Sequence, residues 1–279
     1  MSTLADYRDR PHWSYSALNQ FFNICSLQFA FQRILKLPTA FTPVALGFGS
    51  AYHRVMEHIA LVRMEGRTPS PADASDLFQS AFERQIEDEP DLKFDDGADA
   101  ESCARLGRDM CACYVEGIDP EEQVVAISEA FAVPMTDATG FTLETPLIGE
   151  IDCVVAKDGK KSLVDWKTSG SRWPKAKASR DWQPTAMLLG YGVQHGETPD
   201  FRFDVVVKNK KPVFEQHITT RGPDDFCRLA TLARLAESMI AAEHFAPNEQ
   251  SFYCAGCPYQ TACQAWHRET ARAWVPVAA

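Results

Sequence analysis

Apolar residues recur at helical spacing through the first 120 residues of the chain. A helix is predicted over residues 16–35, with Ser16 as its cap, because five side chains share one face: Leu18, Phe21, Phe22, Cys25 and Phe29. The same spacing predicts helices over residues 49–65, 72–88 and 101–117. The N-terminal part of the chain, residues 1–120, is therefore predicted to be a helical region.

After residue 120 the pattern changes to short runs of apolar and β-branched residues, which are typical of strands. Two helices are predicted over residues 181–192 and 223–243. Strands are predicted over residues 123–133, 141–156, 162–167, 202–207 and 213–219. This order predicts an α/β fold with a mixed sheet flanked by helices. Residues 121–222 would form the core, and residues 223–279 a C-terminal helix and a cysteine-rich tail.

The composition excludes a fibrous or mainly disordered chain, because 45% of its 279 residues are hydrophobic and 24% are charged. The net charge of −10 argues against a protein that coats nucleic acid with its whole surface, but it permits a local basic channel. No run of about 18 apolar residues exists, so no membrane span is expected. No secretion signal is visible, and we expect a cytoplasmic location. Nine cysteines in such a chain favour metal or cluster ligation over disulfides.

Acidic and basic side chains interrupt the two apolar strands around the turn at residues 157–160. Asp165 and Lys167 are two residues apart and point to the same face of one strand. The tight turn can bring Asp152 of the preceding strand beside Asp165. Two carboxylates on one face suit a hard divalent cation, and a nearby lysine can offset charge on a phosphate. Together these groups can hydrolyse a phosphodiester.

The alternative is that an Asp-X-Lys pattern lies on an exposed strand by chance. The apolar residues around the charges argue against it, because buried charge without a role is costly. His53, on the predicted second helix, would by itself more often be an ordinary packed histidine. If it is a ligand, Mn²⁺ should activate at least as well as Mg²⁺, because imidazole binds Mn²⁺ better.

At these residues the chain resembles the PD-(D/E)XK nucleases, and within them the RecB-like branch with its iron–sulfur CRISPR-associated and phage exonucleases. The resemblance covers about residues 14–267. The matching segments, in order, are Ser14–Leu18 leading to Cys25, Gly49–His53, Gly149–Asp152, Asp165–Thr168, Gln183 and three tail cysteines. The resemblance implies a restriction-endonuclease-like core with an N-terminal helical region and a C-terminal iron–sulfur cap.

The resemblance also implies roles for single residues. Asp152 and Asp165 would bind Mg²⁺ or Mn²⁺ with help from His53, and Lys167 would be the catalytic lysine. Gln183 would begin a Gln-x-x-x-Tyr motif that touches the substrate. Met187 stands where that motif has tyrosine, and Tyr191, one turn further along the helix, is the candidate to replace it.

The tail cysteines form a C-x2-C-x5-C pattern. In the families that this chain resembles, such a pattern and a cysteine of the first helix hold a [4Fe–4S] cluster, here with Cys25, Cys254, Cys257 and Cys263 as the four thiolates. Closing a loop of roughly 230 residues would make this cluster a staple, with a closure entropy on the order of 5 kcal/mol. Two alternatives stay open: a zinc ion bound by the tail cysteines with Cys25 or His267, or simply buried thiols.

Basic residues gather next to Lys167. Residues 157–180 contain eight basic and two acidic residues, with Trp173 in the same stretch and Trp182 just after it. Such a mixture is typical of a groove that follows a nucleic-acid backbone and stacks bases, although a solvated loop would look similar. Arg172, Lys175 and Lys177 are therefore candidate substrate-binding residues, and the resemblance adds Tyr191 to them.

The sequence thus predicts a metal-dependent deoxyribonuclease, acting as an exonuclease on single-stranded or free-ended DNA in recombination, repair, phage or CRISPR-related processing. A helicase, recombinase or integrase would be its partner. The alternatives are a CRISPR-adaptation nuclease, a non-catalytic DNA- or partner-binding subunit with a retained nuclease fold, and a zinc-stabilised interaction module.

Overall fold

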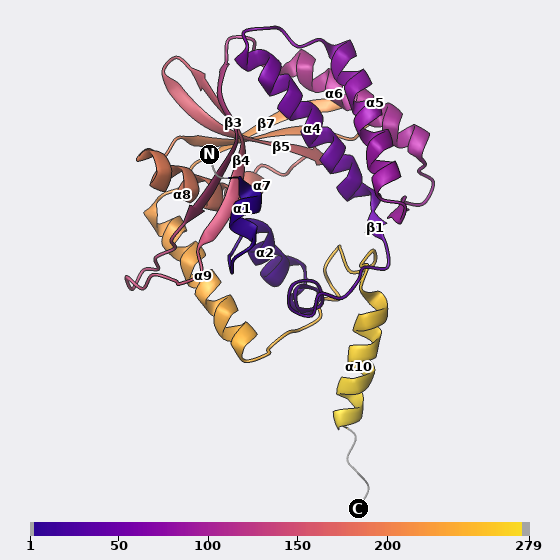
Figure 1. The fold of residues 1–279 in the computed structure, drawn as a ribbon, viewed down its shortest axis with the longest axis vertical. Coiled ribbons are helices and arrows are strands. Elements are labelled where there is room, and N and C mark those ends of the chain that lie inside the picture. Colours follow the sequence, from indigo (N-terminus) through magenta and orange to yellow (C-terminus); the bar gives the residue numbers. More distant parts are fainter. Residues whose placement is uncertain (1–2, 275–279) are drawn as a thin grey trace, which may run out of the picture.

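The computed structural model describes residues 3–274 and has a five-stranded mixed sheet at its centre (Figure 1). The strands follow one another in chain order across the sheet, and only β5 and β6 are parallel. They are β3 (Gln123–Val133), β4 (Leu147–Lys157), β5 (Lys160–Ser169), β6 (Asp200–Val207) and β7 (Val213–Thr219). The predicted mixed sheet flanked by helices is confirmed.

Three long helices cover one face of the sheet: α4 (Val44–Met64), α5 (Pro71–Asp88) and α6 (Ala100–Gly117) (Figure 1). The Ser70 side chain accepts from the first turn of α5, and the Asp99 side chain does the same for α6, so local capping sets where both helices begin. Their apolar faces pack on Val164, Trp166 and Val206 of the sheet. This packing fixes α4, which carries His53, over strand β5.

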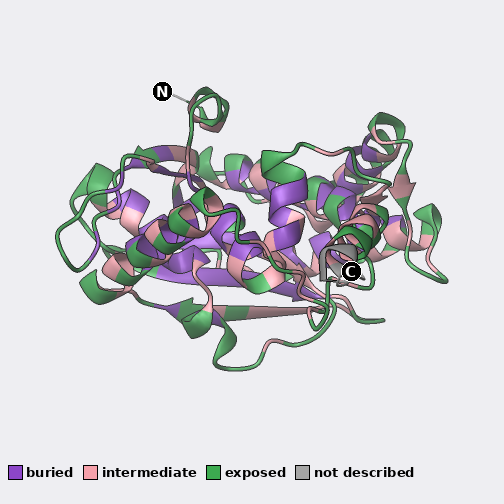
Figure 2. Ribbon diagram, turned by 90° about the horizontal axis from the view of Figure 1, so that it is seen from below, coloured by how far each residue is buried: buried purple, intermediate pink, exposed green. Residues whose placement is uncertain are grey.

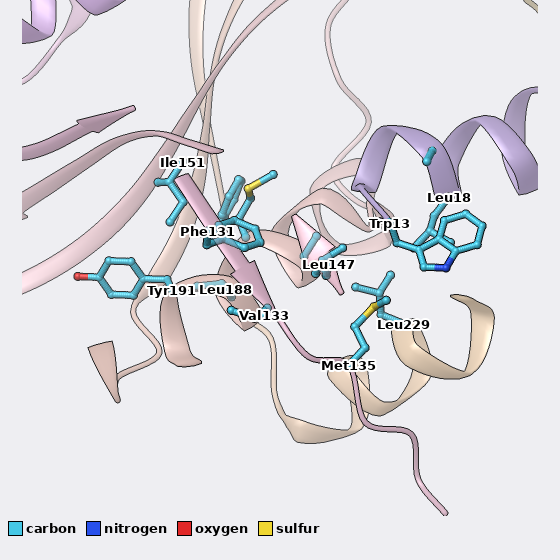
Figure 3. Packing of buried hydrophobic residues seen from close by; sticks show 14 of the residues in the cluster. Trp13, Leu18, Phe131, Val133, Met135, Leu147, Ile151, Leu188, Tyr191 and Leu229 are labelled. Atoms are coloured by element: carbon cyan, nitrogen blue, oxygen red, sulfur yellow. The ribbon is translucent and has the colours of Figure 1, made fainter. Parts of the chain in front are cut away.

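The opposite face of the sheet is covered by α8 (Gln183–His195) and α9 (Pro223–Ala241), with the short helices α1 (Leu4–Arg8) and α7 (Lys177–Arg180) nearby. Phe131 lies at the centre of this second cluster (Figure 3). A Cβ atom added at Gly149 or at Gly190 would lie 2.5 Å from its ring. The two glycines therefore form the slot that lets α8 approach β4 closely.

The helix predicted over residues 16–35 is broken into four turns: α2 (Tyr15–Asn19), η1 (Gln20–Ile24), α3 (Ser26–Phe29) and η2 (Ala30–Ile34), of which η1 and η2 are π-helical. Ser14, not Ser16, caps it, because the Ser14 hydroxyl accepts from Ala17. Cys25 adopts an extended conformation with φ −173° and ψ 118°, and its sulfur accepts from the Gln28 N–H at 3.4 Å. The helical turns are therefore interrupted at Cys25.

The predicted strand over residues 141–156 is shorter than expected. Strand β4 begins at Leu147, and Phe141 is half exposed in the preceding connection. Trp13 holds the start of β4 through backbone hydrogen bonds to Pro146 and Ile148. The N-terminal segment therefore pairs with the first residues of β4.

The tail ends in α10 (Gln260–Trp274), which extends away from the sheet (Figure 1). A small cluster with Leu27, Phe31 and Tyr259 at its core joins the tail to α3 and η2. The strands β1 (Thr42–Pro43) and β2 (Leu92–Lys93) pair in parallel beside α4. Buried residues concentrate in the sheet and the helix faces that cover it (Figure 2). None of the helices described here has the length and apolarity needed to cross a bilayer.

Candidate active site

Two carboxylates lie side by side where β4 and β5 separate. The antiparallel ladder between these strands ends with Cys153 opposite Val164. Asp152 and Asp165 are the next residues on the two strands. The backbone N–H of Trp166 donates to Oδ2 of Asp152 at 3.1 Å, which ties the first carboxylate to the strand that carries the second. The structure thus brings the two acids together.

A local twist of β4 aims Asp152 toward β5. Ile151 and Cys153 are two residues apart, yet they pack in the clusters on opposite faces of the sheet. A regular strand would place both on one face. The neighbouring strand is distorted at the same level, because Ser128, between the partners of Ile151 and Cys153, has a φ of 51°. The distortion separates the strands and frees the carboxylates from the ladder.

Burial raises the pKa of Asp152 well above its usual range, and the neighbouring Asp165 carboxylate raises it further. Asp165 itself is only 4% exposed. Two carboxylates with so little water around them repel each other. A divalent cation between them would relieve that repulsion.

Lys167 and Gln183 both contact Asp165. Nζ of Lys167 lies 2.5 Å from Oδ2 of Asp165, and the Gln183 side-chain amide donates to Oδ1. Burial lowers the pKa of Lys167, but the Asp165 and Asp152 carboxylates outweigh burial, so the net shift of its pKa is upward. Lys167 is therefore an ammonium group at neutral pH.

His53 faces the same centre from α4. Its Nδ1 lies 3.4 Å from Oδ2 of Asp152, and its ring packs edge-on against Trp166. Burial lowers the pKa of His53, and the Lys167 ammonium lowers it further. The imidazole is therefore neutral at neutral pH, which is the form that can bind a metal ion.

The chemistry of these side chains fits a divalent cation. Among residues 3–274, no three His, Cys, Asp or Glu side chains already surround a single point as a formed ion site does. Mg²⁺, however, is commonly held by one or two carboxylates and keeps several waters. The buried Oδ2 of Asp165 has no hydrogen-bond donor in suitable geometry in the described part of the chain. Asp152, Asp165 and His53 would hold the cation.

Two residues that the sequence did not indicate position this centre. Asp181 accepts from the backbone N–H of Gln183 at 2.9 Å and fixes the start of α8. Arg221 donates to the carbonyls of Ala178 and Asp181 and to the hydroxyl of Thr185. An aspartate two residues before the observed start of α8 is a recognisable capping signal, whereas nothing local indicates the role of Arg221.

Tyr191 lies away from the carboxylates, toward the far end of α8. Its hydroxyl donates to Glu197 at 3.2 Å, and its ring stacks on His195 at the far end of α8. Glu197 also pairs with Lys161, at the opposite end of β5 from the site. Since Gln183 begins α8, two further helical turns carry Tyr191 past the site. Met187 is buried against Gly149.

The predicted substrate-binding cations lie in the segment that precedes α8. Lys175 is exposed, and Nζ of Lys177 lies 4.4 Å from the ring centre of Trp173. Arg172 pairs with Glu215 at 3.2 Å. Lys177 also lines an open pocket together with Arg180 and Trp182.

The four cysteines singled out from the sequence line one cavity: Cys25, Cys254, Cys257 and Cys263. Burial raises the pKa of the Cys263 thiol, and the other three thiols raise it further. Gln28 donates its backbone N–H to the Cys25 sulfur and its side-chain amide to the Cys257 sulfur, both at 3.4 Å. No disulfide joins any cysteine in the described residues.

The other cysteines lie elsewhere, and His267 is paired with Glu249 at 3.3 Å rather than lining this cavity. Four thiols and two N–H···S contacts around one cavity suit a cluster held by thiolates. Thiolates around a cluster stand farther apart than thiolates around one ion. The residues therefore fit such a group even though none of the described side chains forms a single-ion site.

Comparison with known proteins gives one family match and a structural likeness. The model of the PD-(D/E)XK nuclease superfamily matches residues 12–264. A crystal structure of a candidate exonuclease from Eubacterium rectale shares 12% identity, with a TM-score of 0.55, over 92% of this chain and 93% of that chain. At that identity the likeness shows the fold alone. A second structure, SSO0001, has 13% identity over 94% of this chain and 92% of that chain, with a TM-score of 0.43. No curated protein matches the sequence.

Proposed function

The chain belongs to the PD-(D/E)XK nuclease superfamily, and from that premise we propose that it is a metal-dependent DNA exonuclease acting on single-stranded or free-ended DNA. The observation that carries the proposal is the convergence of Asp152, Asp165, Lys167 and His53 where β4 and β5 separate. The cations around Lys177, beside the start of α8, support a polyanionic substrate.

A bound divalent cation supplies a Lewis acid for the phosphodiester and a water of lowered pKa. Asp152 and Asp165 would hold that cation, with the neutral His53 as a further ligand. Lys167, beside Asp165, would offset negative charge that develops on the phosphate. Gln183 fixes the orientation of the Asp165 carboxylate through its side-chain amide.

The first test is hydrolysis of an end-labelled single-stranded oligonucleotide with Mg²⁺ or Mn²⁺. Asp165→Ala and Lys167→Ala should each lower the rate roughly 10²-fold or more, because each removes a group that stabilises charge in the transition state. Lys160→Ala, at the exposed far end of β5, is the matched control and should keep the wild-type rate. A circular single strand of the same sequence should stay intact if a free end is required.

Unchanged rates in both active-site variants, with their thermal unfolding close to that of the wild type, would remove the mechanism. Cleavage of the circle at the same rate as the linear strand would identify an endonuclease instead. A wild type with no hydrolysis under any divalent cation would leave only a non-catalytic subunit.

For the tail we propose that Cys25, Cys254, Cys257 and Cys263 hold a [4Fe–4S] cluster. The cluster supplies a covalent cross-link between the N-terminal turns and the tail. The four thiols share one cavity, yet no three of the described side chains there are placed to hold a single ion, which supports a cluster over zinc. Anaerobically purified protein should be brown, absorb near 400 nm and contain iron and sulfide. Colourless protein with stoichiometric zinc would overturn this assignment.

A further inference from the structure

An open groove, of about 470 Å³, lies between the N-terminal turns and the cysteine tail. We call it the aromatic groove and define it by Tyr15, Gln20, Arg33, Phe41 and Tyr253. It is distinct from the catalytic carboxylates, none of which lines it. Its walls come from segments that are more than two hundred residues apart in sequence, so no local pattern indicates it.

Tyr15 connects the aromatic groove to the catalytic centre. Helix α2, which Tyr15 begins, packs against α8, and the ring of Phe22 contacts Trp182 edge-on at 5.9 Å. Burial raises the pKa of Tyr15, and the Asp181 and Asp165 carboxylates raise it further. Asn19 of α2 lines both the aromatic groove and the pocket at Asp181 and Trp182. The groove therefore adjoins the start of α8, where Gln183 reaches Asp165.

Two aromatic rings are open to a ligand along the aromatic groove. Tyr253 is 58% exposed, and Phe41 is half-buried with Nζ of Lys93 4.5 Å from its ring centre. An exposed ring such as that of Tyr253 can stack on an unpaired base, and a nearby cation such as Lys93 can meet the adjoining phosphate. Paired bases in a duplex are not available for such stacking.

Arg33 adds a fixed cation to the groove. The buried Gln20 accepts from Nε of Arg33 at 2.8 Å and donates its own amide to Gln28 and Gln32 at 3.2 and 2.6 Å. This network holds the guanidinium by one edge. Its two terminal nitrogens have no acceptor among the described residues, so they are available for a phosphate, which a guanidinium can bind with two parallel hydrogen bonds.

We propose that the aromatic groove binds the unpaired DNA strand next to the scissile phosphate, with bases stacked on Tyr253 and Phe41 and a backbone phosphate on Arg33. This assignment rests on the proposed nuclease function, because the occupant of the groove is the continuation of the strand held at Asp165. In this assignment the groove, and not the metal-binding carboxylates, selects single-stranded over duplex DNA.

The test is the affinity of the full-length protein for a fluorescent single-stranded oligonucleotide, measured by anisotropy in EDTA so that no cleavage occurs. Tyr253→Ala and Phe41→Ala should each weaken binding roughly 5- to 100-fold, as loss of one stacked base does. Phe252→Ala is the matched control. Phe252 is 93% exposed and contacts Tyr253 but does not line the groove, so its loss should change the affinity less than about 2-fold.

A blunt hairpin duplex of the same sequence separates stacking from general attraction. Its affinity should be the same for Tyr253→Ala and wild type, whereas Arg33→Gln should weaken binding of the single strand more than that of the hairpin. Equal losses on both DNAs, or wild-type affinity in both aromatic variants, would overturn the proposal. Tyr253→Leu and Phe41→Leu keep apolar bulk but lack the ring. If the alanine variants lose affinity because stacking is lost, and not because they unfold, the leucine variants should lose affinity to the same extent.

Hydrolysis of a small phosphodiester by the wild type, read together with the binding data, distinguishes failure of the groove from failure of the proposed nuclease. A small diester such as bis(p-nitrophenyl) phosphate has no strand to place in the groove, so its Mn²⁺-dependent hydrolysis tests only the carboxylates and Lys167. Hydrolysis of the small ester with Tyr253-independent DNA binding would reject the groove alone. Tyr253-dependent binding without any hydrolysis would reject the nuclease and retain the groove.

Discussion

Asp165 and Asp204 are buried carboxylates on adjacent parallel strands, but their partners give them different roles. Arg202 lies 2.8 Å from Asp204 and also binds Glu122, and Gln216 donates to Asp204 at 3.2 Å. Asp204 is thus enclosed in a network without access to a ligand. Asp165 instead keeps one oxygen that only Lys167 approaches in the described structure, which suits a cation site.

The pH dependence of stability should report the burial of Asp204. Burial raises the pKa of Asp204 to about 6 although Arg202 opposes the shift. Because the folded pKa exceeds the unfolded value, the stabilising contribution of this group is complete below the unfolded pKa and is lost as pH rises through 6. The unfolding free energy of the wild type relative to Asp204→Asn should therefore fall by roughly 3 kcal/mol between pH 4 and pH 7.

Urea unfolding of both proteins at several pH values measures this difference. Asp158→Asn, at the exposed turn between β4 and β5, controls for the loss of one surface charge. A wild-type-minus-variant difference that is flat from pH 4 to pH 7 would contradict the assignment.

At the scale of elements, close contact between α8 and the sheet sets the position of Gln183. Phe131 fills the slot between Gly149 on β4 and Gly190 on α8 (Figure 3). Arg221 holds the first turn of α8 from the other side. The amide of Gln183 reaches Asp165 because the helix is fixed at both points.

Gly190→Ala should lower the unfolding free energy by about 1–3 kcal/mol, because its Cβ would overlap the Phe131 ring. Gly192→Ala, two residues further along α8, is the matched control. Its Cβ would meet only ordinary contacts at 3.6 Å or more, so the better helix propensity of alanine should raise stability by up to about 1 kcal/mol. Chemical denaturation of the wild type and the two variants measures whether the unfolding free energy falls in Gly190→Ala and rises in Gly192→Ala. Equal stability of the two variants would show that the slot can relax.

At the scale of the whole molecule, the tail is joined to the body by a small apolar cluster and by the four-cysteine cavity. The backbone N–H of Leu27 donates to Ala246, and that of Ala40 donates to Pro258, which adds two links. Helix α10 itself extends away from the sheet (Figure 1). A cross-link through the thiols would therefore carry much of the attachment.

Cys257→Ser should abolish iron binding and lower the unfolding free energy by up to about 5 kcal/mol, the entropy of closing the long loop. Cys227→Ser, on α9 and outside the cavity, is the control and should keep its iron. Iron analysis, thermal unfolding and limited proteolysis around residues 242–259 measure the outcome. Equal iron content in both variants would exclude Cys257 as a ligand.

Local patterns in the sequence determined most of the secondary structure and the pairing of Asp152 with Asp165. Alternation of side chains along strands and the tight turn at residues 157–160 are properties of a few neighbouring residues, so they can be read directly. The same is true of Asp165 and Lys167 on one strand. The helix over residues 16–35 was predicted as continuous because the distortion at Cys25 leaves its apolar spacing intact.

Only the tertiary structure decided which distant residues meet. Asp181 and Arg221 hold the first turn of α8, and Tyr191 lies at the far end of that helix, because packing on the sheet sets the direction of α8. The aromatic groove likewise joins the two ends of the chain. Such contacts depend on how whole elements pack, and that information is spread over many residues instead of being contained in one local pattern.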